Sequence, residues 1–321
     1  MKIKTFFKTM VYAGISASLC LGATASATEY RKVATASTTG AFYPIGGVIA
    51  SILSDEMKGY NFTAEATGGS VENARLIGAG ESDIGFFGGD TLWNANHATG
   101  PFEGRPAIPL APIARIYSMP LHFVTLKNSG IKTIADLQGK RVAVGAPGSG
   151  TGSKAKIVLE GAGFKYGEDI TPRLLNFREG ADALVDGNVD AVVISVGMPS
   201  GNVQEIAATH DVVLAGIGEE HLELMVKAAS YLEPFVIPGG TYTKVDQDVQ
   251  TISTSTYLAV HKDMDEKEVY NICMTLFDKN LDRFKAGHAA LRTTPVDEYP
   301  QGIMALHPGA ERCYKDMGLI E

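Results

Sequence analysis

The sequence has few of the residues that build metal sites and nucleophilic active sites. Three cysteines and seven histidines are spread over 321 residues, and no two histidines have the H-x-x-x-H or H-E-x-x-H spacing that binds zinc. No G-x-S-x-G elbow, which would present a nucleophilic serine, occurs either. No pair of carboxylates stands out from the acidic background. We therefore assign no catalytic residue, no metal ligand and no cofactor.

Basic residues are also in short supply. The chain carries 28 Lys and Arg against 36 Asp and Glu, a net charge of −8 at pH 7. Lys2, Lys4 and Lys8 lie in the first 27 residues, which contain no Asp or Glu. The rest of the chain therefore has 25 basic and 36 acidic residues, a net charge of −11. This balance argues against nucleic acid or an anionic membrane surface as a partner. A small anionic solute stays compatible, since helix dipoles can reverse the field inside a cleft.

Long hydrophobic runs are missing as well. The apolar stretch Val11–Leu21 is too short to span a bilayer comfortably; it follows the three lysines and precedes Ala25-Ser26-Ala27, an A-x-A cleavage motif. We predict that residues 1–27 are a signal peptide cleaved near Ala27, which places the mature protein in the periplasm with no direct membrane insertion. A lipoprotein anchored through Cys20 is the alternative, but Leu19 stands where a lipobox normally has a small residue.

Cleavage would leave two cysteines, Cys273 and Cys313. Their spacing matches no metal-binding motif. Two interpretations are open: a disulfide that joins the helix around 269–277 to the C-terminal helix in an oxidising compartment, or two buried free thiols.

Glycine is abundant, with 36 residues, and one glycine-rich stretch is central to the prediction. Residues 141–159, RVAVGAPGSGTGSKAKIVL, indicate a short strand, a glycine-rich loop and a helix. Such a junction points free backbone N–H groups and the positive end of a helix dipole at one spot, which suits an anion. Lys154 does not stand where a Walker A loop requires its lysine, and the glycines do not follow G-x-G-x-x-G. The candidate ligand contacts are Ser149, Gly150 and Thr151, and a tight structural turn is the alternative.

The same plan occurs earlier in the chain. Residues 32–53 again indicate a strand, a loop and a helix, with Pro44 at a plausible first helical position. A loop, a short helix, a Gly-x-x-Asp turn and an apolar strand then occur in both 68–90 and 177–197. We therefore predict an α/β protein with two βαβ-type lobes, whose strand-to-helix loops face each other across a ligand cleft. The further ligand candidates on these loops are Thr39, Gly40, Phe42, Tyr43, Ser70, Asn73 and Gly197.

Two extended segments are predicted to join the lobes. We expect 113–126 to run from lobe to lobe and 253–261 to return. This assigns residues 28–120 plus 251–321 to lobe 1 and residues 121–250 to lobe 2.

Four residues near these crossings have two interpretations each. Arg115, Tyr117 and His122 could reach a ligand from the first crossing, and Arg115 and His122 are the candidates to bind a carboxylate; packing or an inter-lobe hydrogen bond is the alternative. Asp90 is either the N-cap of a helix over 91–98, which we favour, or a ligand contact.

A set of motifs runs in order along the chain: Thr39-Gly40-x-x-Tyr43-Pro44-x-Gly46-Gly47, Ala66-Thr67-Gly68-Gly69-Ser70-Val71-Glu72-Asn73, Val144-Gly145-Ala146-Pro147-Gly148-Ser149-Gly150-Thr151, Ile237-Pro238-x-Gly240-x-Tyr242 and Leu306-His307-Pro308-Gly309-Ala310. Together they resemble the TAXI-type solute-binding proteins of tripartite ATP-independent periplasmic (TRAP) transporters, over essentially all of the mature chain. The chain departs from many members at Gly88-Gly89, where they have a polar residue, and this puts a side-chain contact there in question.

The resemblance implies a type II periplasmic-binding-protein fold, two α/β lobes joined by a hinge with a ligand cleft between them. It also implies a function: capture of a small anionic solute, such as glutamate, glutamine or a dicarboxylate like 2-oxoglutarate, and its delivery to the membrane permease subunits of a Na⁺-coupled TRAP transporter. An exported ligand-sensing subunit that docks a receptor is one alternative. An enzyme on the same scaffold is another, because fold alone does not fix function.

Overall fold

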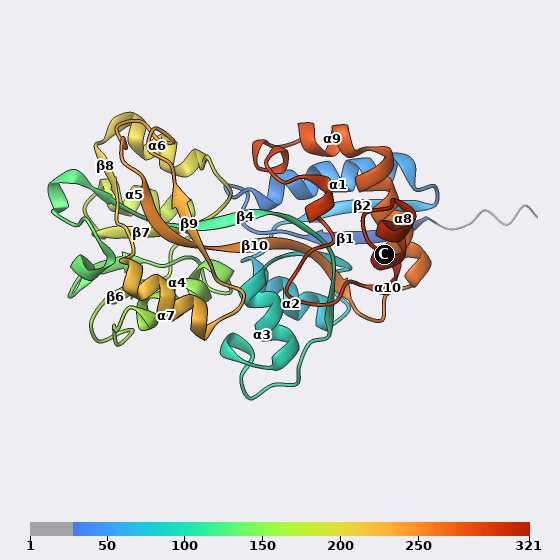
Figure 1. Ribbon diagram of the computed structural model, residues 1–321, viewed down its shortest axis with the longest axis horizontal. Coiled ribbons are helices and arrows are strands. Elements are labelled where there is room, and N and C mark those ends of the chain that lie inside the picture. The colour runs from blue at the N-terminus through green and yellow to red at the C-terminus, as the bar shows by residue number, and fades with distance from the viewer. Residues whose placement is uncertain (1–27) are drawn as a thin grey trace, which may run out of the picture.

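The structure, a computed structural model, describes residues 28–321, and the predicted signal peptide with its cleavage site lies outside them. Figure 1 shows two lobes joined by two long strands. These strands, β4 (Leu110–Leu126) and β10 (Val249–His261), pair with each other in antiparallel orientation. The predicted lobe boundaries at residues 120 and 250 fall inside β4 and β10, and the assignment of residues to lobes stays a prediction.

Lobe 1 contains the first half of the repeated plan. Its strands are parallel in the order β2-β1-β3, and β10 adds to β3 in antiparallel orientation. The helices that end the chain also belong to this lobe, and α8 packs against α10. The elements are β1 (Glu29–Ala34), α1 (Phe42–Glu56), β2 (Tyr60–Glu65), α2 (Ser70–Gly78), β3 (Ile84–Gly88), α3 (Gly89–His97), α8 (Glu266–Met274), α9 (Leu281–Ala286) and α10 (Pro308–Asp316).

Lobe 2 contains the second half of the plan. Here β4 pairs antiparallel with β7, and β7, β5 and β6 are parallel neighbours. Strand β8 also pairs with β4, and β9 pairs with β10. The elements are β5 (Arg141–Ala143), α4 (Gly150–Gly161), β6 (Thr171–Arg173), α5 (Phe177–Val185), β7 (Ala191–Ser195), α6 (Gly201–Thr209), β8 (Val212–Leu214), α7 (Glu219–Ala228) and β9 (Glu233–Ile237).

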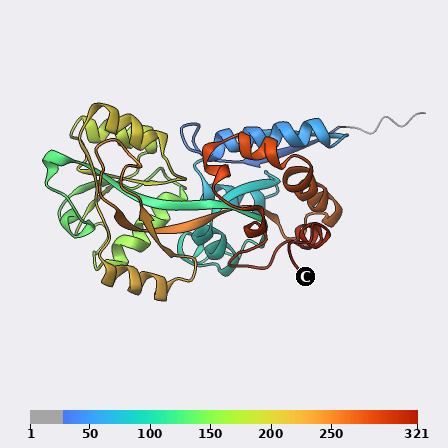
Figure 2. The same ribbon diagram turned by 45° about the horizontal axis from the view of Figure 1, so that its top comes forward.

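Helices cover both faces of the sheet in each lobe, as Figure 1 and Figure 2 show from two directions. The sequence requires this, because every residue of β3 and β7 is buried and a strand without a polar face needs cover on both sides. Helix α1 buries Ile45, Ile49, Ile52 and Leu53, the one-sided stripe that a helix lying on a sheet presents. Among residues 28–321, no helix has both the length and the apolar composition needed to cross a membrane.

Two helix starts differ from the prediction. Helix α1 begins at Phe42, so Pro44 is its third residue and not its first; proline is tolerated there because first-turn N–H groups have no intrahelical acceptor. Helix α3 begins at Gly89 with Gly88 as its N-cap, so the N-cap interpretation of Asp90 is wrong. Asp90 is the second helical residue, where its charge still complements the positive end of the helix.

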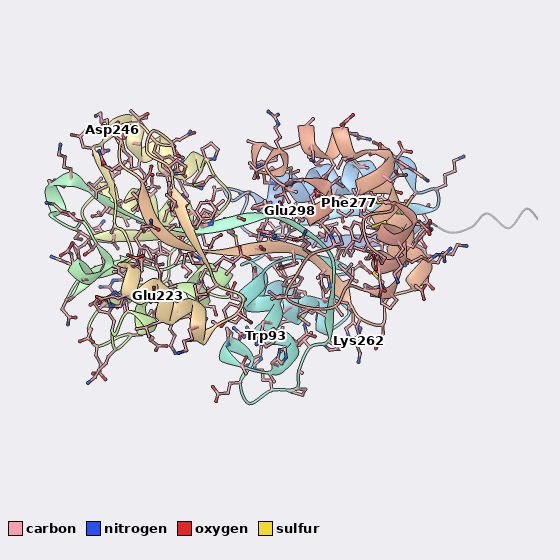
Figure 3. The ribbon with its side chains drawn as sticks, viewed as in Figure 1. Trp93, Glu223, Asp246, Lys262, Phe277 and Glu298 are labelled. Carbon is pink, nitrogen blue, oxygen red and sulfur yellow. A yellow bond between two sulfur atoms is a disulfide. The ribbon has the colours of Figure 1, made fainter. Side chains whose placement is uncertain are left out.

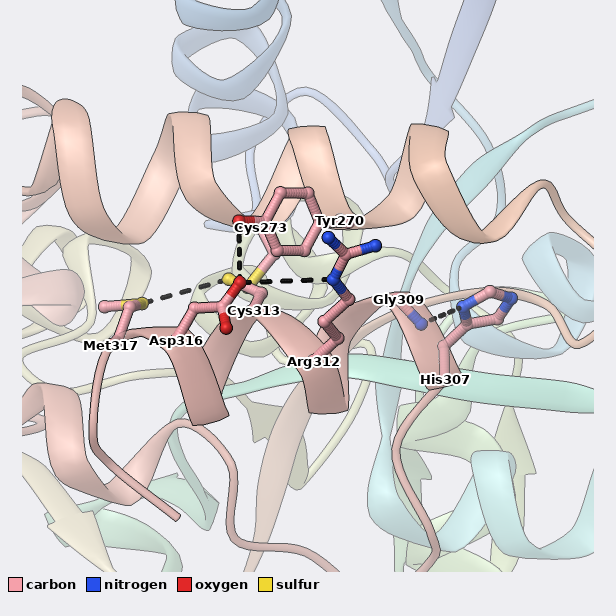
Figure 4. Close-up of a disulfide and its surroundings, with 8 residues drawn as sticks. All are labelled: Tyr270, Cys273, His307, Gly309, Arg312, Cys313, Asp316 and Met317. Carbon is pink, nitrogen blue, oxygen red and sulfur yellow. Dashed lines mark hydrogen bonds and ion pairs between the residues drawn. A yellow bond between two sulfur atoms is a disulfide. The ribbon is translucent and has the colours of Figure 1, made fainter. Parts of the chain in front are cut away.

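A disulfide joins α8 to α10 at the end of lobe 1, between Cys273 and Cys313, with a Cα–Cα distance of 6.2 Å (Figure 4). Next to it, the Tyr270 hydroxyl donates to Asp316 Oδ2 over 2.9 Å. Phe277, labelled in Figure 3, packs its ring 5.0 Å from that of Tyr299 in the same lobe. The two cysteines thus belong to the core of lobe 1 and not to the region between the lobes.

Candidate functional site

A cavity of about 230 Å³ lies between the lobes, lined by loops of both. It is formed where the repeated strand-loop-helix units end, which is the edge of an open α/β sheet at which ligands bind. Six of the predicted ligand contacts line it: Gly40, Phe42, Ser70, Ser149, Gly150 and Thr151.

The N-terminal ends of four helices meet at this cavity. The lining includes Phe42, Ser70, Gly150 and Phe177, the first residues of α1, α2, α4 and α5. Each helix has at least nine residues, so each contributes the partial positive charge of its macrodipole. The cavity is therefore electropositive without an arginine in its lining, in a protein that is acidic overall.

The capping pattern differs between the lobes. In lobe 2, Ser149 Oγ accepts from the Gly152 N–H over 3.1 Å, and the Asn176 side chain accepts from the Glu179 N–H over 3.0 Å. In lobe 1, neither α1 nor α2 has a side-chain cap. A bound anion would therefore find first-turn N–H groups of lobe 1 that no capping side chain satisfies.

Apolar side chains form the rest of the cavity wall. Phe42, Met119, Phe177 and Val196 line it, and Phe42 stacks on Phe86 with ring centroids 5.0 Å apart. Phe177 is a lining residue that the sequence analysis did not single out. Polar groups at helix ends opposed by apolar walls are typical of a site that fixes the orientation of a small ligand.

The lobes touch each other directly beside the cavity. The Glu72 N–H of α2 donates to the carbonyl of Gly148 over 3.2 Å, and on the other side Asn202 Nδ2 donates to the carbonyl of Thr39 over 3.2 Å. A Cβ on Gly68 would come within 2.7 Å of the Pro147 carbonyl oxygen. The glycines of the two loops therefore permit the close approach that encloses the cavity.

Asn73 was predicted to contact the ligand, but it does not line the cavity. It is fully buried; its Nδ2 donates to the carbonyls of Thr35 and Phe86 over 2.8 and 2.9 Å, and its Oδ1 accepts from Thr67 Oγ1 over 2.6 Å. Because these bonds use both amide protons and Asn73 does not line the cavity, its side chain fixes the ends of two strands and the Thr67 loop and has no free donor for a ligand.

The two candidates for binding a carboxylate also lie outside the cavity lining. His122 Nε2 pairs with the Tyr242 hydroxyl over 2.8 Å, and burial lowers the His122 pKa to about 4. Arg115 donates to Ser255 Oγ over 2.7 Å and forms an ion pair with Glu298 at 3.4 Å. Both interact within the fold, which is the alternative that the sequence left open.

The remaining predicted residues are distributed around the cavity. Thr39 and Gly197 line a second crevice, of about 610 Å³, and Gly40 lines both. Tyr117 is buried, within 3.1 Å of the Cβ position of Gly197, and its hydroxyl has no hydrogen-bond partner among the described residues. Tyr43 is half-buried and lines neither space. Thr39, Tyr43, Tyr117 and Gly197 do not line the smaller cavity.

A buried charge pair that the sequence analysis missed lies next to the cavity. Lys154 and Asp90 are both fully buried, with Nζ 3.8 Å from Oδ1. Burial lowers the pKa of Lys154 and raises the pKa of Asp90, and the attraction between the two groups partly offsets both shifts. A sequence signal existed: Lys154 falls on the buried stripe of α4 with Ala155, Val158 and Leu159, where a lysine is unusual.

The described residues that line the cavity include no acidic, basic or histidine side chain. Within residues 28–321 there is no cluster of three or more side chains that could hold a metal ion. Ser149 is used as a helix cap, and the hydroxyl of Ser195, which lines the cavity, accepts from Lys154 Nζ over 2.8 Å.

Comparison with known proteins agrees with this geometry. Residues 33–318 match the profile of the NMT1-like family, and the chain belongs to that family. Among solved structures it is similar to PhnD1 from Prochlorococcus marinus in complex with methylphosphonate, at 12% identity and a TM-score of 0.56, covering 91% of this chain and 100% of that one.

A second similar structure is the binding-protein component of an ABC phosphonate transporter from Pseudomonas aeruginosa. It is 13% identical, with a TM-score of 0.52, over 82% of this chain and 79% of that one. A third comes from work on glutathione import in Streptococcus mutans, at 12% identity and a TM-score of 0.52, over 81% and 92% of the two chains. At these identities the likeness shows the fold, the two-lobed type II fold of periplasmic binding proteins.

Proposed function

We propose that this protein is a periplasmic solute-binding protein that captures a small anionic solute between its lobes. The observation that carries the proposal is the convergence of four helix N-termini on one cavity between the lobes. Backbone dipoles at helix N-termini bind carboxylate, phosphonate or sulfonate groups without a counter-charged side chain. The proposed contacts are Ser70, Ser149, Gly150 and Thr151 on the polar side and Phe42 on the apolar side.

The size of the cavity supports a small solute. Its volume of about 230 Å³ is below the roughly 300–1,000 Å³ of pockets for drug-sized ligands. Glutamate, glutamine and dicarboxylates such as 2-oxoglutarate are the solutes that the resemblance to TAXI-type proteins implies. The methylphosphonate bound to PhnD1 extends the class of anions to be tested.

The partner that we propose is a Na⁺-coupled TRAP permease, on the strength of the motif series along the chain. The solved structures named above include components of ABC transporters, which makes an ATP-driven permease the alternative. Uptake assays in proteoliposomes that contain a candidate permease of either kind, with this protein added outside, distinguish the two. Uptake that needs a Na⁺ gradient supports the proposal, whereas uptake that needs internal ATP contradicts it.

The ligand class is tested by thermal unfolding of residues 28–321 against 2-oxoglutarate, L-glutamate, L-glutamine, methylphosphonate and neutral sugars. A ligand at about 100 times its Kd stabilises the folded state by about 2.7 kcal/mol, which is a shift of several degrees. A shift with an anion, recovered chemically unchanged, supports a binding protein. A shift with sugars alone contradicts the assignment of an anion site, and turnover of the ligand contradicts a pure binding function.

The site assignment is tested at Thr151. This side chain lines the cavity, is only 7% exposed and makes no hydrogen bond within the fold, so Thr151→Val keeps its shape and removes only its hydroxyl. We expect the Kd for the anion to rise about tenfold or more, the value of one hydrogen bond to a charged group. Thr151→Ser, which keeps the hydroxyl, is the control. Equal affinity of all three proteins, measured by calorimetry, would show that this hydroxyl does not contact the ligand.

A further inference from the structure

We propose that Lys154 is a positioning residue that sets the charge preference of the cavity, acting through the hydroxyl of Ser195. The inference rests on the proposed function and extends it by naming the side chains that recognise the sign of the ligand. Neither residue was among the predicted contacts, and Lys154 itself does not line the cavity.

Hydrogen bonds and a nearby carboxylate fix the position of the buried ammonium group of Lys154. Its side chain is fully buried, and Nζ donates to Ser195 Oγ over 2.8 Å and to Thr254 Oγ1 over 2.6 Å. These acceptors come from β7 of lobe 2 and from the crossing strand β10. Asp90 in α3 of lobe 1 lies 3.8 Å from Nζ. The ammonium group therefore lies where both lobes and the crossing strand meet.

The hydrogen bond from Lys154 determines how Ser195 can act. A hydroxyl has one proton and two lone pairs, so a serine that accepts from an ammonium group has its own proton available for another acceptor. Within the described residues, Ser195 Oγ makes no hydrogen bond besides that from Lys154, and Ser195 lines the cavity. Its proton is therefore available to an acceptor in the cavity, and the adjacent positive charge strengthens that donor.

Asp90 serves as the counter-charge and not as a ligand contact. Its carboxylate does not line the cavity, and its Oδ1 has no hydrogen-bond partner among residues 28–321. A carboxylate in that place favours the charged form of Lys154 against the effect of burial, without presenting negative charge to the ligand. Of the two charged groups, it is therefore Lys154 that acts on the cavity, through its hydrogen bond to Ser195, next to the four helix N-termini.

The consequence is a preference for a ligand group that accepts hydrogen bonds and carries negative charge. A carboxylate or phosphonate oxygen accepts from Ser195 and is attracted by Lys154. An ammonium group in the same place could only donate, and would meet a donor and a like charge. A carboxamide accepts but lacks the charge, so it should bind more weakly than its isosteric carboxylate.

The test compares variants by their discrimination between anionic and neutral probes. Lys154→Met combined with Asp90→Asn removes the charge of both partners, because removing the lysine alone would leave a buried unpaired carboxylate. Ser195→Ala removes the intermediate hydroxyl and keeps both charges. Lys156→Met is the matched control, since Lys156 lies on the same helix α4 with its side chain 56% exposed. Kd values are measured for 2-oxoglutarate, L-glutamate and methylphosphonate, and for the neutral diamide glutaramide.

We expect the double variant and Ser195→Ala each to raise the Kd for the anions at least tenfold, while the Kd for glutaramide, which accepts an uncharged hydrogen bond, rises clearly less and the control changes less than twofold. Adding Ser195→Ala to the double variant should cost little more, because both changes remove the same interaction. Unchanged anion affinity, or an equal loss for anions and glutaramide, overturns the inference and leaves the proposed function standing. If the double variant does not fold, Ser195→Ala decides the question alone. A wild-type protein that binds none of the three anions overturns the proposed function and this inference with it.

Discussion

Ser70, Ser149 and Thr151 could be placed at the cavity from the sequence because backbone geometry fixes their positions. Each is within one residue of a helix start that follows a glycine-containing loop, and such starts gather at one edge of an α/β sheet. Lys154, Asn73 and His122 show the other case. Their roles depend on which partners the tertiary fold supplies, Ser195 for the lysine and Tyr242 for the histidine. No local pattern specifies a partner 41 or 120 residues away.

His122 leads to a prediction about pH. In the fold its Nδ1 faces the carbonyls of Pro120 and Ile194, both at 3.2 Å, and burial lowers its pKa to about 4. The unfolded chain has a histidine pKa of about 6.5 and takes up the proton first as the pH falls. The contribution of His122 is therefore intact above pH 6.5 and is lost as the pH falls from there toward 4.

The expected size is about 2 kcal/mol of unfolding free energy lost between pH 7 and pH 5, since one unit of pKa shift corresponds to about 1.4 kcal/mol. Urea denaturation at the two pH values measures it, and His122→Gln provides the reference because glutamine does not titrate. The variant should be less stable at pH 7 and should lose about 2 kcal/mol less than the wild type on acidification. The same pH dependence in both proteins would assign the acid sensitivity to other groups, such as His307, whose pKa burial also lowers.

At the scale of elements, the repeated strand-loop-helix plan was the most informative signal in the sequence. The residues at which its helices begin were the least predictable feature. Helix α1 and strands β3 and β7 follow from their apolar periodicity. The start of α1 at Phe42 and of α3 at Gly89 differ from the prediction, because a proline or an acidic residue is compatible with several first-turn positions. The length of β4, 17 residues, also could not be predicted, since its pairing partners come from both lobes.

The loop before α2 carries a prediction about closure. Gly68→Ala would place a Cβ 2.7 Å from the Pro147 carbonyl oxygen of the opposite lobe, and a backbone atom cannot move aside cheaply. We expect the variant to resist full closure and to bind the anion at least tenfold more weakly, with an unchanged melting temperature when free of ligand. Gly47→Ala, in α1 with no atom within 4 Å of its Cβ position, is the control. Equal affinity of Gly68→Ala and wild type by calorimetry would mean that the loops separate when ligand is bound.

The disulfide between α8 and α10 carries a prediction about stability that is independent of binding. It closes a loop with a sequence separation of 40 residues, for which the chain-entropy relation gives about 4 kcal/mol of stabilisation at 25 °C. Replacing Cys273 and Cys313 by serine should lower the unfolding free energy by about that amount, measured in urea at pH 7. The Kd for the anion should not change, because the bond lies outside the cavity lining. A large change in Kd would instead show that the end of lobe 1 is coupled to the cavity.

At the scale of the whole molecule, the two lobes meet where strands cross, where loops touch around the cavity and where Asp90 of α3 faces Lys154 of α4. Strands β4 and β10 pair with each other and continue into both lobes, so bending them moves one lobe as a body against the other. A solute that contacts Ser70 in lobe 1 and Thr151 in lobe 2 gains all its contacts only when the lobes are together. It therefore shifts the population toward the closed arrangement.

This shift can be measured across the mouth of the second crevice, where Asn202 Nδ2 of lobe 2 donates to the Thr39 carbonyl of lobe 1 over 3.2 Å. Thr39→Cys with Asn202→Cys places two thiols there, and the native cysteines of the described chain do not compete because they are bonded to each other. A short bifunctional thiol reagent should cross-link the pair several-fold faster with 2-oxoglutarate or L-glutamate than without, and glutaramide should have a smaller effect. Asn202→Cys alone controls for a change in thiol reactivity. Equal rates with and without anion would mean that the lobes are already together before the solute arrives, so that binding would depend on transient opening and not on closure.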